Sequence, residues 1–312
     1  MYEGVQIEPV GPGSIREAMR FLVGGRRLDA ALAVRAEAME TMTNSRGGPF
    51  AMRWARRGGQ CVAVALVVAS PGRTGMLYHC PAQADGVDAD CLPDVVRAVS
   101  AEALAGGLAF VQSLVRKMGR TDVVMLSAAG YERLAELVYM KCGVAGPAAA
   151  RGHARFSWRS YGEFSEDDLA EVIQGTYAES LDCPALCGLR ELSDVVRGHK
   201  ASGTFCPETW WIAEQSGRPA GCILLNDSAV HRGAMDVVYM GVVSGYRGGG
   251  LGRAMIRHAA RAARRRGRSF LTLAVDADNV YAKRIYDGEG FREIDRRIAY
   301  IATPQRLNPQ ET

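Results

Sequence analysis

The sequence predicts an α/β protein with two domains, each a mixed, mostly antiparallel sheet flanked by helices. Three observations support this fold class. The chain has 312 residues, enough for two compact domains of about 150 residues each. Apolar residues make up 48% and charged residues 23%, as in a globular protein with a full core. Strand and helix patterns also alternate along the second half of the chain.

In the second half the patterns follow one another in a readable order. Ser165 and Asp168 form an S-x-x-D cap in front of a helical pattern. Two apolar runs separated by Ser216 and Gly217 predict a β-hairpin. The expected strands are 154–161, 210–214, 221–226, 235–243, 269–275 and a closing pair within 291–302. The expected helices are 165–179, 191–199, 250–266 and 279–289.

The first half has a similar but less distinct outline. The expected helices are 15–42, 92–115 and 131–141, and the expected strands are 61–70, 73–80 and 123–127. A small, Pro/Gly-punctuated stretch without periodicity separates the two halves. The expected domains are therefore 1–145 and 154–303, with a linker at 146–153 and a frayed tail at 304–312.

Composition and charge exclude several classes of function. The net charge of +4 is too small to indicate a nucleic-acid partner. The eight cysteines contain no CxxC pair, so we expect free thiols in a cytoplasmic protein and no metal. The N-terminus lacks the pattern of a signal peptide. The longest apolar run, 61–69, is far too short to span a bilayer, so we expect no membrane partner.

One local charge pattern indicates an anion site. Between Asp236 and Asp276 there is no acidic residue, and eight arginines fall between Arg247 and Arg268. A glycine-rich turn, Gly248-Gly249-Gly250-Leu251-Gly252, lies here between an apolar strand and a helix. Glycines let backbone N–H groups converge on a ligand, and the first helical turn adds unpaired donors and a positive dipole end. Arg247 and Arg253 flank this turn and add formal charge. We therefore predict that the turn binds a phosphate-like anion.

Two sequence blocks resemble the GCN5-related N-acetyltransferase (GNAT) superfamily. Arg247-Gly248-Gly249-Gly250-Leu251-Gly252 is similar to the family's Q/R-x-x-G-x-G/A loop. Asn279-x-x-Ala282-x-x-Ile285-Tyr286-x-x-x-Gly290-Phe291 resembles the family's second signature, at the right distance downstream. The resemblance covers about residues 154–302. The length and two-copy layout also resemble mycothiol synthase, a tandem member that acetylates a cysteinyl amine.

The resemblance implies a cofactor and a role for each matching residue. Acetyl-CoA would be the acetyl donor, and Tyr286 would be the general acid that protonates the departing thiolate. Asn279 would contact the pantetheine region. Backbone groups of Met240, Gly241 and Val242 would pair with the pantetheine arm, and backbone amides of Gly248, Gly249, Gly250, Leu251, Gly252 and Arg253 would bind the pyrophosphate. The chemistry supports these roles, because the attack of an amine on a thioester builds an oxyanion and expels a thiolate.

The acceptor side of the reaction is less defined by the sequence. The attacking amine must be neutral, and Asp236, Glu214 and Asp182 are the candidate bases. Asp182 and Cys183 lie between the first two helices of the second half, where the family builds its acceptor pocket, so we expect both to contact substrate. Direct transfer needs no cysteine nucleophile, and a buried thiol is the alternative for Cys183.

The first half reads as a degenerate copy of the second. Aligning Gly143 with Gly290 places Tyr139 on Tyr286 and Glu132 on Asn279. The segment 83–92 carries aspartates where the second half has arginine and glycine, and these would repel a pyrophosphate. The first half is then expected to be a structural partner.

Three function classes follow from these sequence features. The leading one is an N-acetyltransferase that moves an acetyl group from acetyl-CoA to a primary amine, small molecule or peptide, by direct attack in a ternary complex. The second is a non-catalytic acyl-CoA-binding regulatory module. Nucleic-acid binding through the arginine helix is disfavoured, because aromatic residues do not alternate with its arginines. The sequence does not select the acceptor or the oligomeric state.

Overall fold

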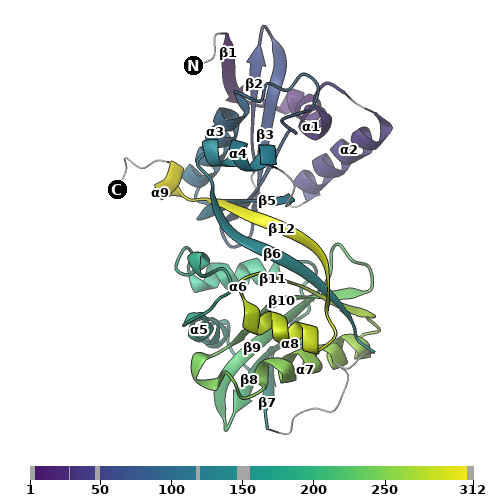
Figure 1. Ribbon diagram of the computed structural model, residues 1–312, viewed down its shortest axis with the longest axis vertical. Helices are drawn as coiled ribbons and strands as arrows, with labels where there is room; N and C mark the ends of the chain where they lie inside the picture. Colours follow the sequence, from purple (N-terminus) through teal and green to yellow (C-terminus); the bar gives the residue numbers. More distant parts are fainter. Residues whose placement is uncertain (1–3, 28, 46–49, 117–119, 146–154, 308–312) are drawn as a thin grey trace. The chain divides into compact units, whose positions relative to one another are not determined.

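A computed structural model describes residues 4–27, 29–45, 50–116, 120–145 and 155–307 (Figure 1). The chain divides into two compact units. Unit 1 comprises Met1–Leu134 and Ile298–Thr312, and unit 2 comprises Ala135–Arg297. The expected linker at 146–153 lies outside the described residues.

Unit 1 contains a mixed sheet with strand order β1-β2-β3-β4-β5, followed by the end of β12. Its strands are β1 (Val5–Pro9), β2 (Phe50–Arg57), β3 (Gln60–Ser70), β4 (Thr74–His79), β5 (Phe110–Arg116) and the last residues of β12 (Arg292–Ala302). Its helices are α1 (Ile15–Gly24), α2 (Ala30–Ser45), α3 (Leu92–Ala105), α4 (Arg120–Ala128) and α9 (Pro304–Leu307), with a 3-10 turn η1 (Pro12–Ser14).

Unit 2 contains a mixed sheet with strand order β6-β11-β10-β9-β8-β7. Its strands are β6 (Glu132–Gly143), β7 (Ser157–Ser160), β8 (Trp210–Gln215), β9 (Arg218–Asp227), β10 (Ala234–Val242) and β11 (Phe270–Asp276). Its helices are α5 (Glu166–Tyr177), α6 (Leu192–Lys200), α7 (Leu251–Arg265) and α8 (Val280–Gly288), with 3-10 turns η3 (Pro184–Leu186), η4 (Pro207–Thr209) and η5 (Ser244–Tyr246). Within the described ranges, no helix is both long and apolar enough to cross a membrane.

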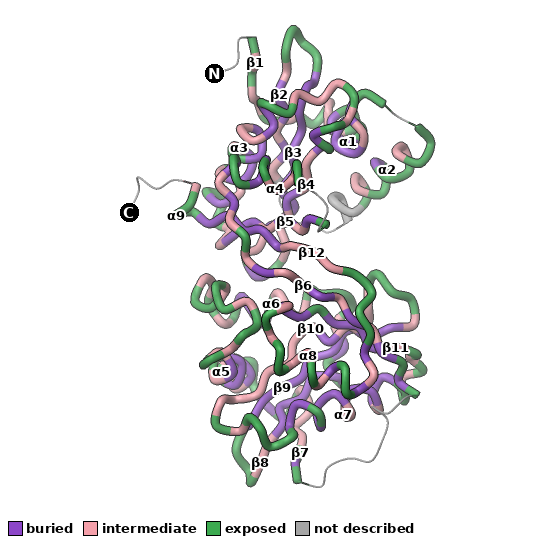
Figure 2. The backbone as a smooth tube through the Cα atoms, viewed as in Figure 1, coloured by how far each residue is buried: buried purple, intermediate pink, exposed green. Residues whose placement is uncertain are grey.

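The sheet of unit 2 buries a core on each face (Figure 2). Side chains alternate along its strands, so Trp211 and Ile223 pack with helix α7, whereas Trp210 and Leu224 pack with α5 and α6. Unit 1 has its own core, built around the buried strand β3. Each unit thus has the layered architecture expected for its sequence, with helices covering a mixed sheet.

The two units exchange their last strands. Strand β6 follows the helices of unit 1 along the chain, but from residue 135 on it belongs to unit 2 and pairs with β11 over residues 137–143. Val138, Met140 and Cys142 are buried in the core of unit 2. In return, Tyr300 and Ala302 of β12 are buried in the core of unit 1. Each unit therefore completes its core with a strand from the other half of the chain.

Most expectations for the second half are confirmed. The Ser165–Asp168 capping box starts α5, and Asn279 caps α8. The hairpin turn at Ser216 and Gly217 has φ values of +53° and +73°, which match a tight turn of the I′ type. The stretch 291–302 forms one long strand, β12, instead of a pair.

Several expectations for the first half are wrong. The stretch 131–141 is not a helix but strand β6, and 123–127 is not a strand but part of helix α4. The helix at 92–115 ends at Ala105, because two glycines follow and β5 begins at Phe110. The alignment of Tyr139 with Tyr286 is also wrong, since Tyr139 lies on a strand and Tyr286 on a helix. Residues 304–307 of the expected tail form α9.

Candidate active site

The central strands β10 and β11 separate in the middle of the sheet. Their parallel ladder joins residues 234–236 to residues 270–272, and no further pair joins them within the described chain. On its other edge β10 pairs with β9 along its whole length, across a bulge between Val237 and Tyr239. A bulge bends the strand that carries it. The edge of β10 at 238–242 therefore presents backbone N–H and C=O groups that an extended, amide-containing ligand can pair with.

The unpaired edge of β10 leads directly into the glycine turn. Gly248 and Gly250 have φ values of +79° and +86°, and a Cβ at either position would meet no other atom within 4 Å. No side chain caps the start of α7, and its first turn contains no acidic residue. The N–H donors of that turn therefore remain available, and the helix dipole makes this end positive. The geometry is that of an open anion site.

Gly252 brings helices α7 and α8 close together at this turn. A Cβ at Gly252 would lie 2.9 Å from Cδ1 of Ile285, so the end of that side chain would have to shift. Ile285 immediately precedes Tyr286 on α8. The start of α7 therefore packs closely against the residue next to Tyr286.

Arg247 does not add its charge to the anion site as expected. Its guanidinium donates to the carbonyl oxygens of Thr176, Ala178 and Glu179 at 2.9, 2.7 and 3.3 Å, and to that of Val242 at 3.2 Å. These carbonyls include those at the end of α5, where unpaired acceptors and the negative end of the dipole attract a cation. Arg247 joins the glycine turn to the segment after α5, and only its backbone faces the turn.

Arg253 and Arg257 share one buried carboxylate. Glu289 is fully buried at the end of α8, with Oε1 3.1 Å from Nε of Arg253. Arg257 makes two hydrogen bonds of 2.9 Å to the same carboxylate. Half of the Arg253 side chain stays exposed beside the glycine turn. The pair fixes α7 to α8, and Arg253 retains access to an anion there.

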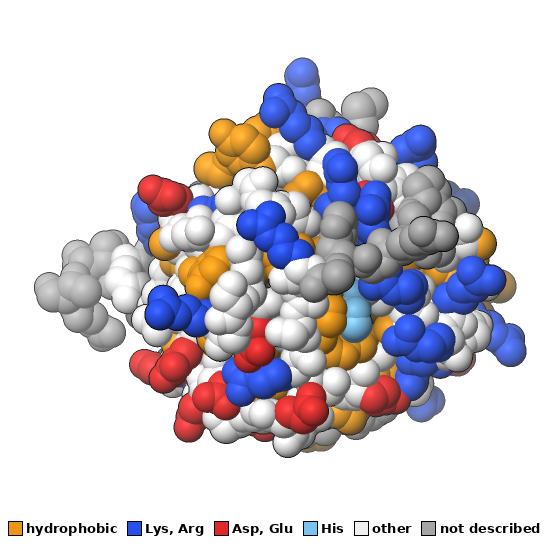
Figure 3. Space-filling model, turned by 90° about the horizontal axis from the view of Figure 1, so that it is seen from below, with side chains coloured by type: hydrophobic (Ala, Val, Ile, Leu, Met, Phe, Trp, Pro, Cys, Tyr) orange, Lys and Arg blue, Asp and Glu red, His pale blue; other side chains and the backbone are white. Residues whose placement is uncertain are grey.

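The remaining arginines of this region contribute less to the site. Arg266 and Arg268 pair with Asp227, whereas Arg264 and Arg265 are exposed. Figure 3 shows basic side chains gathered toward one side of the viewed face and acidic side chains along another. Arg264 and Arg265 therefore form part of a solvated surface of α7.

Tyr286 lies on the first helix after the separated strands, two turns beyond its cap. Asn279 accepts the N–H of Ala282 at 3.2 Å and so begins α8. The Tyr286 side chain is 6% exposed, and its ring lies 5.5 Å from that of Phe291. Its hydroxyl forms no hydrogen bond within the described residues. Burial raises the pKa of Tyr286, and the charge of Asp182 raises it further. Tyr286 is therefore a protonated, unpartnered donor.

Asp182 is brought to the same place from the segment between α5 and α6. Its Oδ1 accepts the backbone N–H of Asp276 at 3.0 Å, and it also bonds to the side chain of Asn279. In return, Asp276 accepts the N–H of Cys183 at 3.2 Å. Asp182 thus bonds to Asp276 and Asn279, and its charge acts on Tyr286; that it contacts substrate stays a prediction.

The other candidate residues take different positions. The carboxylate of Asp236 accepts the hydroxyl of buried Thr272 at the last paired position of β10 and β11. Glu214 forms an ion pair with Arg159 at 2.8 Å across β7 and β8, and β9 separates that pair from β10. Burial raises the pKa of the Cys183 thiol to about 12, so it stays protonated at neutral pH. Asp236 borders the site, whereas Glu214 lies apart from Asp182 and Tyr286.

Sequence reasoning missed Asp276 and Tyr239. Asp276 is buried at the end of β11, and Tyr239 shares a 2.5 Å hydrogen bond with the hydroxyl of Thr176. An acid at the end of a central strand, directly before a helix, was the available signal for Asp276. Within the described residues, no group of three or more His, Cys, Asp or Glu side chains could hold a metal ion.

The sequence comparisons agree on one family. Residues 178–291 match the sequence model of the acetyltransferase (GNAT) family. N-acetyltransferase family 8 member 7 of Mus musculus is 26% identical over 126 residues, which are 39% of this chain and 54% of the relative. The chain therefore spans about half the length of the curated relatives it matches.

Solved structures show the same fold over nearly the whole chain. A GCN5-related N-acetyltransferase from Sphaerobacter thermophilus has a TM-score of 0.60 at 17% identity and covers 97% of both chains. A tandem GNAT protein from the clavulanic acid biosynthesis pathway has a TM-score of 0.54 at 13% identity, covering 96% of this chain and 98% of its own. The closer resemblance to mycothiol synthase is not confirmed and stays a prediction. Residues 178–291 thus match the GNAT family in sequence, and the chain as a whole has the fold of tandem GNAT proteins.

Proposed function

We propose that this protein is an N-acetyltransferase that transfers an acetyl group from acetyl-CoA to a primary amine by direct attack in a ternary complex. One observation carries the proposal: the unpaired edge of β10 leads through the short 3-10 turn η5 into an open, positively biased glycine turn. An extended thioester with amide groups along its arm and a diphosphate at its end complements both parts.

The catalytic roles follow the course of the bound cofactor. Backbone groups of Met240, Gly241 and Val242 pair with the pantetheine arm, and the amides from Gly248 to Arg253 bind the diphosphate. The developing oxyanion takes a backbone N–H of β10. Tyr286 protonates the departing thiolate, a role supported by its place on α8 and by its unpartnered hydroxyl. Asn279 orients the start of α8 beside the arm.

The acceptor is a small-molecule or peptide amine, with neither nucleic acid nor membrane as a partner. A cytoplasmic location belongs to the same proposal. Its support is that all eight cysteines are free, as is usual in a reducing compartment.

Calorimetry with two donors tests this function. Acetyl-CoA and S-acetyl-pantetheine share the thioester and the amide arm, but only acetyl-CoA has the diphosphate. We expect acetyl-CoA to bind at least about 10²-fold more tightly, which corresponds to ~2.7 kcal/mol. A screen of primary amines for CoA release then separates an enzyme from an acyl-CoA-binding regulatory module. Equal affinity for both donors, or no affinity for either, would refute the proposed site.

A further inference from the structure

We propose that Asp182 is the general base that deprotonates the acceptor amine, and that Asp276 positions it. The inference rests on the proposed function and adds the acceptor side of the site. It also defines the substrate class, namely an amine that arrives as a cation.

The segment that carries Asp182 is held in an unfavourable backbone conformation at both ends. Glu179 and Cys183 have φ values of +55° and +46°, in a region that costs a non-glycine residue about 1–2 kcal/mol. Arg247 holds the first end by donating to the Glu179 carbonyl, and Asp276 holds the second by accepting the Cys183 N–H. The loop is therefore fixed, and the Asp182 carboxylate lies at a defined position between its two ends.

Asp182 is an exposed residue whose carboxylate accepts hydrogen bonds from the backbone N–H of Asp276 and from the side chain of Asn279. The groups that interact electrostatically with it in the described chain are Asp276 on β11, Cys183, Tyr239 on β10 and Tyr286 on α8. None of these is a cation. Partial desolvation of the carboxylate raises the pKa of Asp182, and the charge of Asp276 adds to this effect. An ammonium group can reach this exposed carboxylate and would pair with it.

A second observation indicates that the space beside Asp182 takes a ligand. Tyr286 is more than nine-tenths buried, and within the described residues its hydroxyl has no hydrogen-bond partner. The hydroxyl oxygen is not fully enclosed, so it can donate to a ligand that approaches it. The charge of Asp182 acts on this same side chain. A thioester sulfur on one side and an amine on the other would satisfy both groups.

The two other candidate bases have side-chain partners outside the group formed by Asp276, Asn279 and Tyr286. Asp236 accepts the hydroxyl of Thr272, and Glu214 is paired with Arg159 on the outer strands β7 and β8. Asp182 is the candidate that lies with Tyr286 and Asn279.

With Asp182 as base and Tyr286 as acid, every proton of the acetyl transfer is accounted for. The acceptor ammonium gives one proton to the Asp182 carboxylate, and the neutral amine forms a bond to the thioester carbonyl carbon. When the carbon–sulfur bond breaks, Tyr286 protonates the thiolate and recovers a proton from the former amine nitrogen. The products are the acetamide, CoA and one proton, which Asp182 releases to solvent.

The test compares two acceptors with acetyl-CoA as donor. Ethylamine is protonated at neutral pH, whereas hydroxylamine is largely neutral and needs no base. For Asp182→Asn we expect kcat/KM with ethylamine to fall about 10²-fold at pH 7. The loss should shrink as pH rises and the free amine accumulates. Turnover of hydroxylamine and the KM for acetyl-CoA should change little.

The controls separate the base from a structural role. Asp278→Asn removes an exposed carboxylate from the turn between β11 and α8, and it should leave the rates with both amines unchanged. Asp182→Glu keeps the carboxylate, so it should retain the pH profile of the wild type and guards against a misfolded Asn variant. An equal fall in kcat/KM of Asp182→Asn with both amines at every pH would refute the role of Asp182 as base, but not the proposed function. If the wild type turns over neither amine, or fails to bind acetyl-CoA, the proposed function falls with it.

Discussion

Units 1 and 2 build the same strand-turn-helix core at a constant spacing of 160 residues. Strand β5 (Phe110–Arg116) corresponds to β11 (Phe270–Asp276), and helix α4 (Arg120–Ala128) to α8 (Val280–Gly288). In unit 1, residues 74–76 of β4 pair in parallel with residues 110–112 of β5, just as residues 234–236 and 270–272 pair in unit 2. Both units thus have a central pair of strands whose ladder is equally short.

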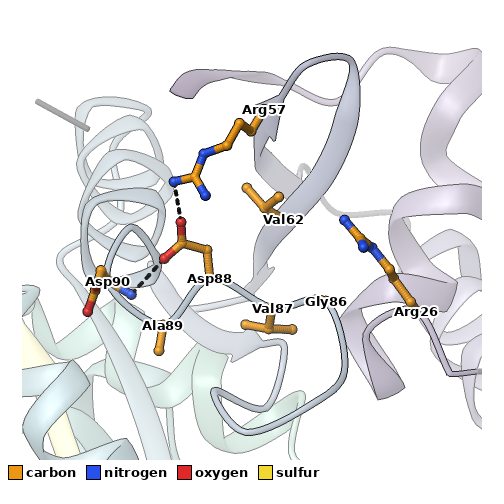
Figure 4. A pocket seen from close by; sticks show the side chains of 8 residues that line it. All are labelled: Arg26, Arg57, Val62, Gly86, Val87, Asp88, Ala89 and Asp90. Carbon is orange, nitrogen blue, oxygen red and sulfur yellow. Dashed lines mark hydrogen bonds and ion pairs between the residues drawn. The ribbon is translucent and has the colours of Figure 1, made fainter. Parts of the chain in front are cut away.

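The turn after the separated strand is where the two units differ most. Asp88 and Asp90 of unit 1 stand at the positions of Gly248 and Gly250. The Asp88 carboxylate accepts the N–H of Asp90 at 3.1 Å and pairs with Arg57 at 2.5 Å. A pocket of about 530 Å³ lies here (Figure 4). In unit 1 the Asp88 carboxylate thus occupies this turn as an internal anion, whereas the corresponding glycine turn of unit 2 contains no acidic side chain.

Helix α8, which carries the proposed proton donor Tyr286, also differs from its counterpart α4 in unit 1. Gly130 and Gly290 follow α4 and α8 with φ values of +91° and +90°, and each allows the same hydrogen bonds at the helix end. With this alignment Tyr286 corresponds to Leu126, which is fully buried. Unit 1 shares the packing of the fold but has neither the open glycine turn nor the tyrosine that we propose as the anion site and the acid of unit 2. The comparison therefore distinguishes residues that build the fold from residues that serve the chemistry.

The largest expected effect comes from cutting the chain in two different places. A fragment of residues 135–297 keeps β6 beside β11 and should unfold cooperatively in urea, as judged by far-UV circular dichroism. A fragment of residues 154–312 lacks buried Val138, Met140 and Cys142, which contribute about 1.5–3 kcal/mol each. It also exposes the edge of β11, so we expect no cooperative transition. Equal folding of both fragments would contradict the strand exchange.

Exchanging the residues at the proton-donor position should have the next largest effect. Tyr286→Phe is expected to lower kcat by about 10²–10⁴-fold, because it removes the general acid. Calorimetry should show unchanged affinity for acetyl-CoA. Leu126→Tyr in unit 1 should add no activity and cost about 1–3 kcal/mol by overpacking the core. Full turnover by Tyr286→Phe would argue for a binding module instead of an enzyme.

Copying the turn of unit 1 into unit 2 should weaken cofactor binding. In the double variant Gly248→Asp and Gly250→Asp, each new carboxylate near a phosphate costs about 1 kcal/mol or more even in water. We expect acetyl-CoA to bind about 10²-fold more weakly in calorimetry. Gly248→Asn with Gly250→Asn is the matched control, because it imposes the same strain at positive φ without the negative charge. An unchanged affinity in the double variant would place the diphosphate elsewhere.

Removing the link at Arg247 should have the smallest effect on stability. Unit 1 has Val87 at the corresponding position. Arg247→Ala leaves the carbonyls at the end of α5 to water, which we expect to cost about 1–2 kcal/mol. Calorimetric scanning should show the Tm falling by about 2–8 °C. Arg264→Ala, exposed on α7, should shift it by less than about 1 °C. A similar Tm for both variants would show that these contacts add no stability.

The sequence predicted the elements whose signals are local. The caps at Ser165 and Asn279, and the apolar runs of β10 and β11, depend on neighbours a few residues away. The prediction for strand β6 was wrong because its apolar residues also satisfy a helical spacing, namely Tyr131, Leu134, Ala135 and Val138. In addition, its partner strand β11 is distant in the sequence.

The same distinction holds for the site. The glycine turn could be predicted from residues in one stretch. The bond between Asp182 and Asp276 joins segments far apart in the chain, and the use of Arg247 at the end of α5 depends on how that helix packs. Neither contact has a signal within one stretch of sequence.

The exchange of strands also sets the order in which the protein can fold during synthesis. Unit 2 has all of its residues once position 297 has been made, whereas unit 1 waits for Tyr300 and Ala302, which are translated after it. The half that is synthesised first is therefore the one completed last. Until then the open edge of its sheet needs protection from aggregation, and a nascent chain stalled before residue 298 should remain sensitive to protease in its N-terminal half.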